Sequence, residues 1–182
     1  MDIQLYAIHV VPVILIVYFA VVLFMHPPKE VILASLAGGL VMAILNALGD
    51  LLAYYVSWWH YSASGLVLHL PLPFYLTQLF IFGGLPYVLI WRFTDGREAA
   101  GQSPNHRLAL ALLIGVPLLG YARDILDAVV LNSSYLVWDS ALAYVFDLTL
   151  WAAMFFAGYF VFRRVLAPGQ RIQQASGENH AG

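Results

Sequence analysis

Apolar residues fill five long segments of the chain, and few polar residues interrupt them. The segments cover about residues 4–25, 31–58, 71–92, 107–131 and 139–162. A helix crosses the hydrocarbon core of a bilayer in about 20 residues, and every segment reaches that length. The pattern therefore predicts an all-α integral membrane bundle of five transmembrane helices, in one domain at residues 1–166. Residues 167–182 are polar and rich in small side chains, which predicts a disordered cytoplasmic tail.

The composition agrees with a membrane location. The chain is 62% hydrophobic and 10% charged, whereas soluble domains carry about 25% charged residues. We therefore expect the lipid bilayer as a partner, and a bacterial cytoplasmic membrane, the cell inner membrane, as the location. Cysteine is absent, which excludes disulfides and thiolate metal sites.

Several other classes of site find no support in the sequence. The histidines of the predicted outer side, His9, His60 and His69, lack the local spacing of a metal site, so no metal and no cofactor is predicted. Phosphate-binding loops and nucleophile elbows are missing as well. No basic patch of the kind that binds nucleic acid is present, so no nucleic-acid partner is predicted.

The basic residues predict an orientation. Lys and Arg near the ends of spans collect on the cytoplasmic side. Here they occupy the loops after the first and third segments and the tail: Lys29, Arg92, Arg97, Arg107, Arg163, Arg164 and Arg171. This alternation predicts the N-terminus outside and the C-terminus inside. It leaves Arg123 as the basic residue within a span, where it cannot serve as an interfacial anchor.

Arg123 belongs to a predicted polar layer near the outer leaflet. The stretch GYARDILDAVV, residues 120–130, places Arg123, Asp124 and Asp127 in the outer third of the fourth span. Asp50 lies about eight residues, or about 12 Å, below the outer end of the second helix. Asp147, Gln78 and His9 have comparable depths in the other three helices. All five helices are thus predicted to contribute to one layer.

The helical spacing predicts that this layer faces the interior of the bundle. Residues three or four apart share one face of a helix. Such stripes are formed by Asn46, Asp50 and Tyr54, by Tyr121, Asp124 and Asp127, and by Ser140, Tyr144, Asp147 and Trp151. Arg123 and Asp127 are also four residues apart, which predicts a salt bridge within the fourth helix.

The aromatic run YYVSWWHY, residues 54–61, is most simply a belt that anchors the second helix at the membrane interface. The alternative is a wall for a flat or polyunsaturated ligand. If the polar layer binds a lipid-like molecule, the predicted substrate-binding residues are Asn46, Tyr54, Trp58, Gln78, Tyr121, Arg123, Tyr144 and Trp151.

The charge count of the layer suggests chemistry. Asp50, Asp124, Asp127 and Asp147 are acidic and Arg123 alone is basic, while each charge near the middle of a bilayer costs roughly 2.5–3.5 kcal/mol. Either some carboxyls carry protons or a cation enters from outside. A protonated carboxylic acid in an apolar cavity suits proton-initiated chemistry on a hydrophobic substrate. The four aspartates are therefore the candidate acid/base residues.

Two other functions remain open at this point. The layer could only fix helix packing through hydrogen bonds, in a structural or assembly subunit of a membrane complex or oligomer. The carboxylates could also relay protons in a small proton-coupled transporter. The inner halves of all five segments lack charge, which favours a one-sided pocket over a pore.

The chain also contains an approximate internal repeat. GDLLAYYVSWW and RDILDAVVLNS align Asp50 with Asp124, and the following helices end in VLIWRF and YFVFRR. Helices 2 and 3 are therefore predicted to repeat as helices 4 and 5, in the same orientation, as parallel repeats do.

One region resembles the lycopene cyclase domain of small multi-helix carotenoid cyclases. In that family an apolar helix with an Asp leads through a short loop into LPLEE at the start of the next helix. Here about 50 residues around GDLLAYYVSWWHYSASGLVLHLPLPFYLTQLFIF match, with Asp50 and the stretch HLPL, residues 69–72, in corresponding places. Pro73 and Phe74 replace the two glutamates thought to carry the proton chemistry of the family. The resemblance implies a related fold, isoprenoid or carotenoid biosynthesis and lipid binding, with Asp50 as the position that carries over.

Overall fold

The structure is a computed structural model that describes residues 3–130 and 135–178, with side chains up to residue 167. Its long helices are α1 (Ile3–Met25), α2 (Lys29–Tyr55), α6 (His106–Ile125) and α7 (Leu142–Glu178). The third apolar segment contains the 3₁₀ turn η1 (Leu72–Phe74), α3 (Tyr75–Thr77), the π-helical segment η2 (Gln78–Gly84) and α4 (Leu85–Phe93). A short α5 (Asp95–Ala99) follows, and the π-helical segment η3 (Leu126–Val130) continues α6.

Five helical segments of the described residues are long and apolar enough to cross a membrane, as predicted. They are Ile3–Met25, Lys29–Tyr55, Leu72–Phe93, His106–Val130 and Leu142–Ala167. Their ends fall within a few residues of the predicted ones, and Leu131, the predicted end of the fourth span, lies outside the described residues. This is the architecture expected of a multi-pass membrane protein in contact with the bilayer.

The second helix is shorter than predicted because of a turn after Tyr55. Ser57 has a φ of 56°, in the left-handed region where a helix of L-residues ends. The chain then enters the strand β1 (Trp59–Tyr61). Trp58, expected as the last residue of the span, therefore lies in the connection between α2 and β1.

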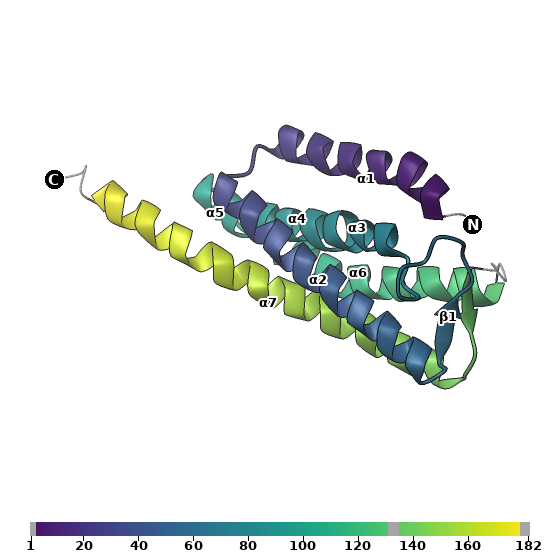
Figure 1. Ribbon diagram of the computed structural model, residues 1–182. Coiled ribbons are helices and arrows are strands. Elements are labelled where there is room, and N and C mark those ends of the chain that lie inside the picture. The colour runs from purple at the N-terminus through teal and green to yellow at the C-terminus, as the bar shows by residue number, and fades with distance from the viewer. Residues whose placement is uncertain (1–2, 131–134, 179–182) are drawn as a thin grey trace.

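A small antiparallel sheet joins two loops at one end of the bundle, which the all-α prediction did not include. β1 pairs with β2 (Leu136–Trp138) so that Trp59 is opposite Trp138 and Tyr61 is opposite Leu136. A side-chain contact also joins the two loops, because His60 Nδ1 in β1 lies 2.7 Å from Oδ2 of Asp139, the residue after β2. We call this end of the bundle, visible on the right of Figure 1, the sheet end.

The centre of the bundle is the close packing of α2 against α7 and η2 (Figure 1). Glycines make the approach possible. A Cβ atom on Gly38 would lie 2.5 Å from the carbonyl oxygen of Gly158 in α7, and one on Gly39 would meet the carbonyl oxygen of Leu79 in η2. Small residues allow membrane helices to pack backbone to backbone in this way. α2 is thereby fixed between the two elements that carry Gln78 and Asp147.

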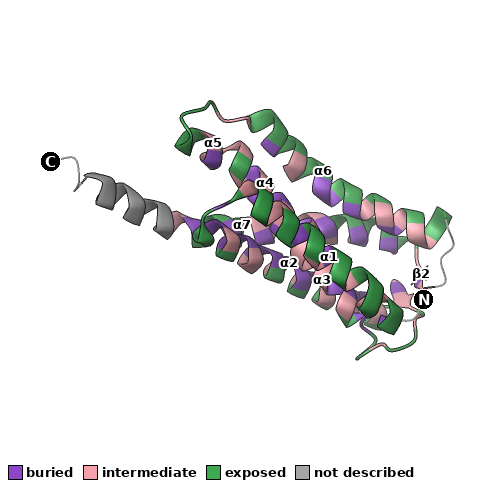
Figure 2. Ribbon diagram, turned by 90° about the horizontal axis from the view of Figure 1, so that it is seen from above, coloured by how far each residue is buried: buried purple, intermediate pink, exposed green. Residues whose placement is uncertain are grey.

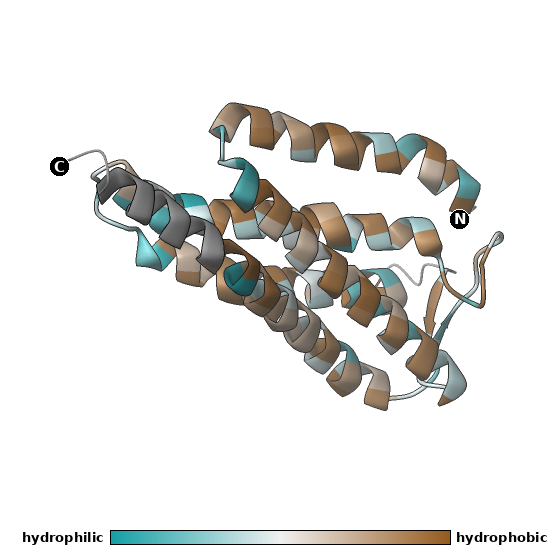
Figure 3. Ribbon diagram, turned by 60° about the vertical axis from the view of Figure 1, so that its left-hand side comes forward, coloured by the Kyte–Doolittle hydropathy of each residue, from teal (hydrophilic) through white to brown (hydrophobic). Residues whose placement is uncertain are grey.

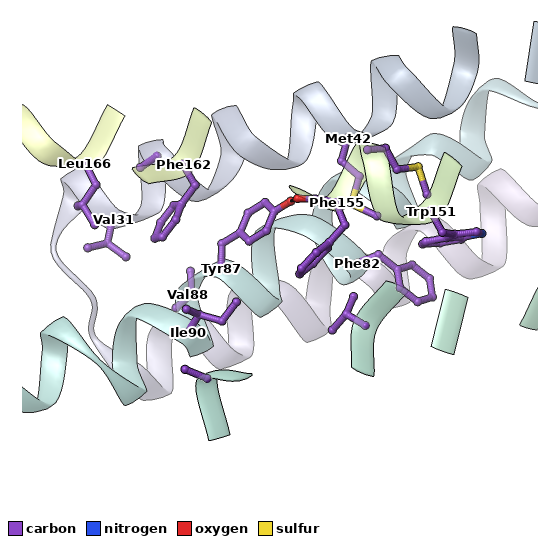
Figure 4. Close-up of a cluster of buried hydrophobic side chains, with 14 residues drawn as sticks. Val31, Met42, Phe82, Tyr87, Val88, Ile90, Trp151, Phe155, Phe162 and Leu166 are labelled. Carbon is purple, nitrogen blue, oxygen red and sulfur yellow. Dashed lines mark hydrogen bonds between the residues drawn. The ribbon is translucent and has the colours of Figure 1, made fainter. Parts of the chain in front are cut away.

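The apolar core runs along this contact (Figure 4). Tyr87 is fully buried among Phe155, Phe162 and Tyr159, and its hydroxyl donates to the carbonyl oxygen of Phe155 at 2.8 Å. The hydrogen bond satisfies a phenol that would be costly to bury alone. At the other end of the cluster, Phe82 and Trp151 meet edge to face with ring centroids 5.0 Å apart. The core thus ends directly below the polar residues of the sheet end.

α1 lies at the edge of the bundle, against the third span and apart from α6 and α7 (Figure 1). Its buried residues are Ile3, Ile14 and Tyr18, and most of its other apolar side chains are exposed (Figures 2 and 3). Exposed apolar residues suit a surface in contact with lipid. Tyr18 attaches the helix to α2 through a hydrogen bond of 3.1 Å between its hydroxyl and that of Ser35.

The end of the bundle opposite the sheet end carries the basic side chains that the structure describes, other than that of Arg123. These are Lys29, Arg92, Arg97, Arg107, Arg163 and Arg164. Arg163 Nη1 donates to Asp95 Oδ2 at 2.9 Å, which joins α7 to α5. The helix α7 continues to Glu178, into the predicted tail at residues 167–182. The disorder of that segment stays a prediction, and residues 179–182 lie outside the described ones.

Candidate acidic site at the sheet end

Four of the predicted polar residues are buried in the half of the bundle next to the sheet end. Asp50, Gln78, Asp124 and Asp147 come from four different spans, and 4–7% of each residue is exposed. The charges of Asp50, Asp124 and Arg123 all act on the carboxyl of Asp147, so these three groups lie near it. We call Asp50, Asp124, Asp147, Arg123 and Gln78 the acidic cluster.

The carboxylate of Asp50 is the most highly bonded group of the cluster. Its Oδ2 accepts hydrogen bonds from Tyr75 (2.8 Å), Tyr61 (3.1 Å) and Asn46 (3.3 Å). Its Oδ1 accepts one from the indole N–H of Trp59 at 3.1 Å. Both oxygens of the carboxylate are therefore hydrogen-bonded, and the four donors come from α2, β1 and α3. Asp50 therefore ties the sheet and the third span to α2.

Asp124 joins α6 to α7. Its Oδ1 accepts from Nε and Nη2 of Arg123 at 3.0 and 2.6 Å, and its Oδ2 accepts from the indole N–H of Trp151 at 2.7 Å. The guanidinium also lies 5.5 Å from the ring centroid of Phe82 and 5.8 Å from that of Trp151, within range of a cation–π interaction. Trp151, a predicted binding residue, thus contacts both members of the pair.

The predicted salt bridge between Arg123 and Asp127 is wrong, because Arg123 binds its neighbour Asp124 instead. α6 gives way to the π-helical η3 at Leu126, and the wider turn of a π-helix changes the angular position of the residues in it. Asp127 is half-buried, and its Oδ2 accepts a hydrogen bond from the hydroxyl of Tyr135 at 3.1 Å.

Asp147 differs from the other two buried aspartates. Its Oδ2 is buried and has no hydrogen-bond partner in the part of the chain that the structure describes, and the same is true of Oε1 of Gln78. Buried polar atoms are nearly always paired, so two such atoms in one polar layer require an explanation. The cluster contains acceptor capacity that the protein itself does not use.

The two unpaired oxygens belong to η2 and α7, which meet at one end of the core. Gln78 precedes Phe82 by four residues in η2, and Asp147 precedes Trp151 by four residues in α7. The rings of Phe82 and Trp151 are in contact, and Figure 4 shows them together at one end of the core. A step of four residues along an α-helix returns to the same face, so Asp147 lies one turn of α7 beyond this contact, whereas Gln78 lies in the wider turn of the π-helical η2.

Other predicted residues lie around the cluster or apart from it. Asn46 and Tyr121 are buried or half-buried within the bundle. Tyr54 stacks on His69 at a centroid distance of 3.9 Å, and Trp58 packs on Phe146 at 4.4 Å. Tyr144 is exposed and packs edge to face on Trp138.

His9 does not join the predicted layer. Its side chain is exposed and bonds the carbonyl oxygen of Leu5, so α1 contributes nothing to the cluster.

The sequence pattern missed the donors that surround Asp50. Trp59, Tyr61 and Tyr75 were not among the predicted site residues, because Trp59 and Tyr61 were expected in an interfacial belt and Tyr75 was not singled out. Burial and the negative charge of Asp50 raise the pKa of the Tyr61 phenol well above its ordinary value, so this residue of β1 remains a donor. The signal available was the density of Trp and Tyr immediately after an intramembrane Asp.

Metal binding gains no support from the geometry. Within residues 3–130 and 135–167, no group of three or more His, Asp and Glu side chains converges as metal ligands would. Comparison of the chain with protein-family models, with curated proteins and with solved structures finds no significant match.

Proposed function

We propose that this multi-pass membrane protein holds its acidic cluster near the outer leaflet, with the N-terminus outside and the C-terminus in the cytoplasm. The support is the gathering of Lys29, Arg92, Arg97, Arg107, Arg163 and Arg164 at the end opposite the sheet. Basic residues next to spans are retained on the cytoplasmic side. A bacterial cytoplasmic membrane is the proposed location.

Reporter fusions test this orientation. A fusion in the loop at Gly101 and a fusion after Gly182 should both show the activity of a cytoplasmic reporter, because the basic residues flanking these positions resist translocation. A fusion within residues 62–66, at the sheet end, should show the periplasmic activity. An outside signal at Gly101 would reverse the orientation and place the acidic cluster near the cytoplasm.

We propose further that the acidic cluster binds or converts a lipid-like, isoprenoid molecule by acid/base chemistry, with Asp147 as the reacting carboxyl. The observation that carries this proposal is the buried, unpaired Oδ2 of Asp147 beside two other carboxylates. An isolated buried charge is strongly disfavoured. A proton on Asp147 or a positively charged ligand removes that cost, and a carboxylic acid in apolar surroundings is suited to protonate a hydrophobic substrate.

Asp50 and Asp124 have a supporting role in this proposal. Their lone pairs are occupied by Trp, Tyr, Asn and Arg donors, so they hold the surrounding side chains in place while Asp147 reacts. Two π-helical segments, η2 with Gln78 and η3 with Asp127, border the same layer. Short π-helical segments are frequent at functional sites.

The resemblance to the lycopene cyclase domain enters this proposal as a suggestion of the substrate class. Asp50 is the shared position. Phe74, at the place of one of the glutamates of that family, is buried and packs edge to face on Tyr135 at a centroid distance of 5.4 Å. The proton donor must therefore be another residue here, and Asp147 is the buried carboxyl with an unused oxygen.

A structural or assembly role is the second candidate, and it is favoured by the hydrogen bonds that both carboxylate oxygens of Asp50 and of Asp124 accept. Groups bonded in this way fix helix packing without any ligand. Proton-coupled transport has less support, because the spans between the cluster and the basic end contain no Asp, Glu, Lys or Arg in the described residues. A relay across the membrane normally uses such residues.

Replacement of Asp147 by asparagine separates the two candidates. Asp147→Asn keeps the volume but cannot ionise or deliver a proton, so we expect unchanged expression, an equal or higher melting temperature and loss of the activity seen as a host phenotype. Asp139→Asn, in the half-exposed loop before α7, is the matched control and should keep that activity. Mass spectrometry of the lipids that copurify in mild detergent provides an independent signal. A deletion strain fully complemented by Asp147→Asn would support the structural role instead.

A further inference from the structure

A pocket with a basic lining opens at the end of the bundle opposite the sheet end, between the third and fourth spans. Its volume is about 460 Å³, within the usual range of ligand pockets, roughly 300–1,000 Å³. The third span ends at Phe93 and the fourth begins at His106, so the pocket lies at the level of the lipid head groups. We call it the basic pocket, and it is lined by Arg97, Ser103, Pro104, Asn105, His106 and Arg107.

The loop that forms the basic pocket is fixed by its own hydrogen bonds. Arg97 Nε donates to the carbonyl oxygen of Ser103 at 2.7 Å. The backbone N–H of Asn105 donates to the carbonyl oxygen of Phe93 at 2.7 Å, which ties the loop to the end of α4. Asn105 Oδ1 also accepts from the backbone N–H of Leu108 at 3.2 Å and so caps α6. The guanidinium of Arg97 is therefore positioned before a ligand binds, which lowers the entropy cost of binding.

The positive charge of the basic pocket is not neutralised by neighbouring side chains. Among the residues whose side chains are described, Arg97 and Arg107 form no ion pair, whereas Arg163 at the same end is paired with Asp95. Glu98 of α5 is exposed and does not line the pocket. A guanidinium has five N–H donors and binds phosphate through two parallel hydrogen bonds. The pocket therefore offers both donors and positive charge to a phosphate group.

An exposed apolar stripe of α6 begins beside the basic pocket. Arg107 is followed on the same face of the helix by Leu110, Ile114 and Leu118. These three residues are 50–55% exposed, and they lie in the membrane-spanning part of α6. The loop between α5 and α6 lies at the surface of the molecule as well (Figure 2). A molecule whose phosphate occupies the pocket thus finds an apolar surface next to it that suits hydrocarbon chains.

From these observations we propose that the basic pocket binds the phosphate of an anionic phospholipid, whose acyl chains lie along Leu110 and Ile114. The inference goes beyond the proposed function, because it concerns the opposite end of the bundle and uses no residue of the acidic cluster. In the proposed orientation this end faces the cytoplasm, where basic pockets between membrane helices bind anionic head groups.

Other ligands match the basic pocket less well. A free phosphate ion fits the two arginines but leaves the apolar stripe of α6 uncovered. A zwitterionic head group such as phosphatidylcholine carries its own ammonium group, which cancels the charge of its phosphate. An anionic phospholipid uses both the positive charge of the pocket and the apolar stripe beside it.

Titration with defined lipids tests this inference. The purified full chain in a mild nonionic detergent receives phosphatidylglycerol or phosphatidylcholine with the same acyl chains, and native mass spectrometry measures the lipid-bound fraction. A basic residue near a membrane surface contributes about fivefold to the affinity for an anionic lipid. Two arginines in the pocket therefore predict that phosphatidylglycerol binds roughly tenfold or more tightly than phosphatidylcholine.

Variants locate the bound lipid. Arg97→Gln and Arg107→Gln should each weaken the binding of phosphatidylglycerol about fivefold and leave that of phosphatidylcholine unchanged. Arg164→Gln, on α7 at the same end, removes the same charge outside the pocket and serves as the control, with a loss of less than about twofold. None of the three arginines is buried, so all three variants should fold, which thermal unfolding verifies.

The possible outcomes separate the lipid from a free anion and the pocket from the general charge of this end. Inorganic phosphate at millimolar concentration should not displace phosphatidylglycerol, because it lacks acyl chains. Displacement by phosphate that depends on Arg97 and Arg107 would assign the pocket to the free ion and exclude the lipid.

Two other results would overturn the inference. The first is equal binding of the two lipids by the original chain. The second is a preference for phosphatidylglycerol that Arg97→Gln and Arg107→Gln leave unchanged, or that Arg164→Gln lowers as much as they do. Each of these results leaves the proposed function of the acidic cluster as it stands, because none of the variants alters that cluster.

Discussion

Replacement of Arg123 by leucine is expected to lower the thermal stability of the protein more than almost any other single change in α6. The guanidinium makes two hydrogen bonds to Oδ1 of Asp124, and this carboxylate is buried between α6 and α7. Removing one partner of a buried pair leaves an uncompensated charge, which costs about 3–5 kcal/mol. The side chain of Arg123 is 36% exposed, so we expect the lower part of this range, measured by thermal unfolding in detergent or nanodiscs.

Double variants identify the partner. Arg123→Leu combined with Asp124→Asn should recover part of the lost stability, because asparagine is uncharged and its oxygen can still accept from Trp151. Arg123→Leu combined with Asp127→Asn serves as the control and should recover none, since Asp127 bonds Tyr135 instead. Recovery by the Asp127 variant and none by the Asp124 variant would restore the pairing that the four-residue spacing suggested.

The Asp50→Leu variant should fail to accumulate in the membrane or should unfold far below the original chain. Leucine has a similar size but leaves the donors of Asn46, Trp59, Tyr61 and Tyr75 without their acceptor. Each unsatisfied buried donor costs about 1–3 kcal/mol, and four of them approach the total stability of a typical domain, about 5–15 kcal/mol. Expression level and melting temperature are the measurements.

Two milder variants set the scale for Asp50→Leu. Tyr75→Phe removes one donor and leaves the carboxylate with three, so its effect should be near the net value of one hydrogen bond to a charged group, about 1.5–3 kcal/mol. Asp50→Asn should fall between the two, because one of its terminal groups no longer accepts. Normal folding of Asp50→Leu would mean that the four hydrogen bonds do not hold the sheet end together.

The spans were predictable because each is a continuous run of apolar residues that is long enough to cross a bilayer. The positions of Asp50, Asp124 and Asp147 along their helices were predictable as well, because they follow from counting residues from the end of each helix. The sheet was not predictable in this way: Trp59–Tyr61 and Leu136–Trp138 are three residues each, and aromatic residues at the end of a span are typical of an interfacial belt. Two segments this far apart in the sequence carry no local pattern that would predict their pairing.

The choice of Asp147 as the proposed reacting residue depends on the structure as well. The repeat drew attention to Asp50 and Asp124, yet both oxygens of each of these carboxylates accept hydrogen bonds from the protein, while Oδ2 of Asp147 has no partner among the described residues. Helical spacing predicted an inward face for every aspartate and places Asn46 beside Asp50. The other three donors of Asp50 come from β1 and α3, which the spacing within one helix cannot indicate. Likewise, the four-residue relation of Arg123 to Asp127 assumed a regular α-helix, and the π-helical η3 begins between them, at Leu126.

The hydrogen bonds of Asp124 and Arg123 bear on how the chain enters the membrane during synthesis. Arg123, Asp124 and Asp127 lie within the fourth span, and each charge near the middle of a bilayer costs roughly 2.5–3.5 kcal/mol on insertion scales. This segment is therefore a poor candidate for independent release into lipid. Phe82, which contacts the Arg123 guanidinium, is already made when α6 emerges, whereas Trp151 is not. The fourth span should therefore wait at the translocon until α7 is available, and the two helices should leave it together as a pair.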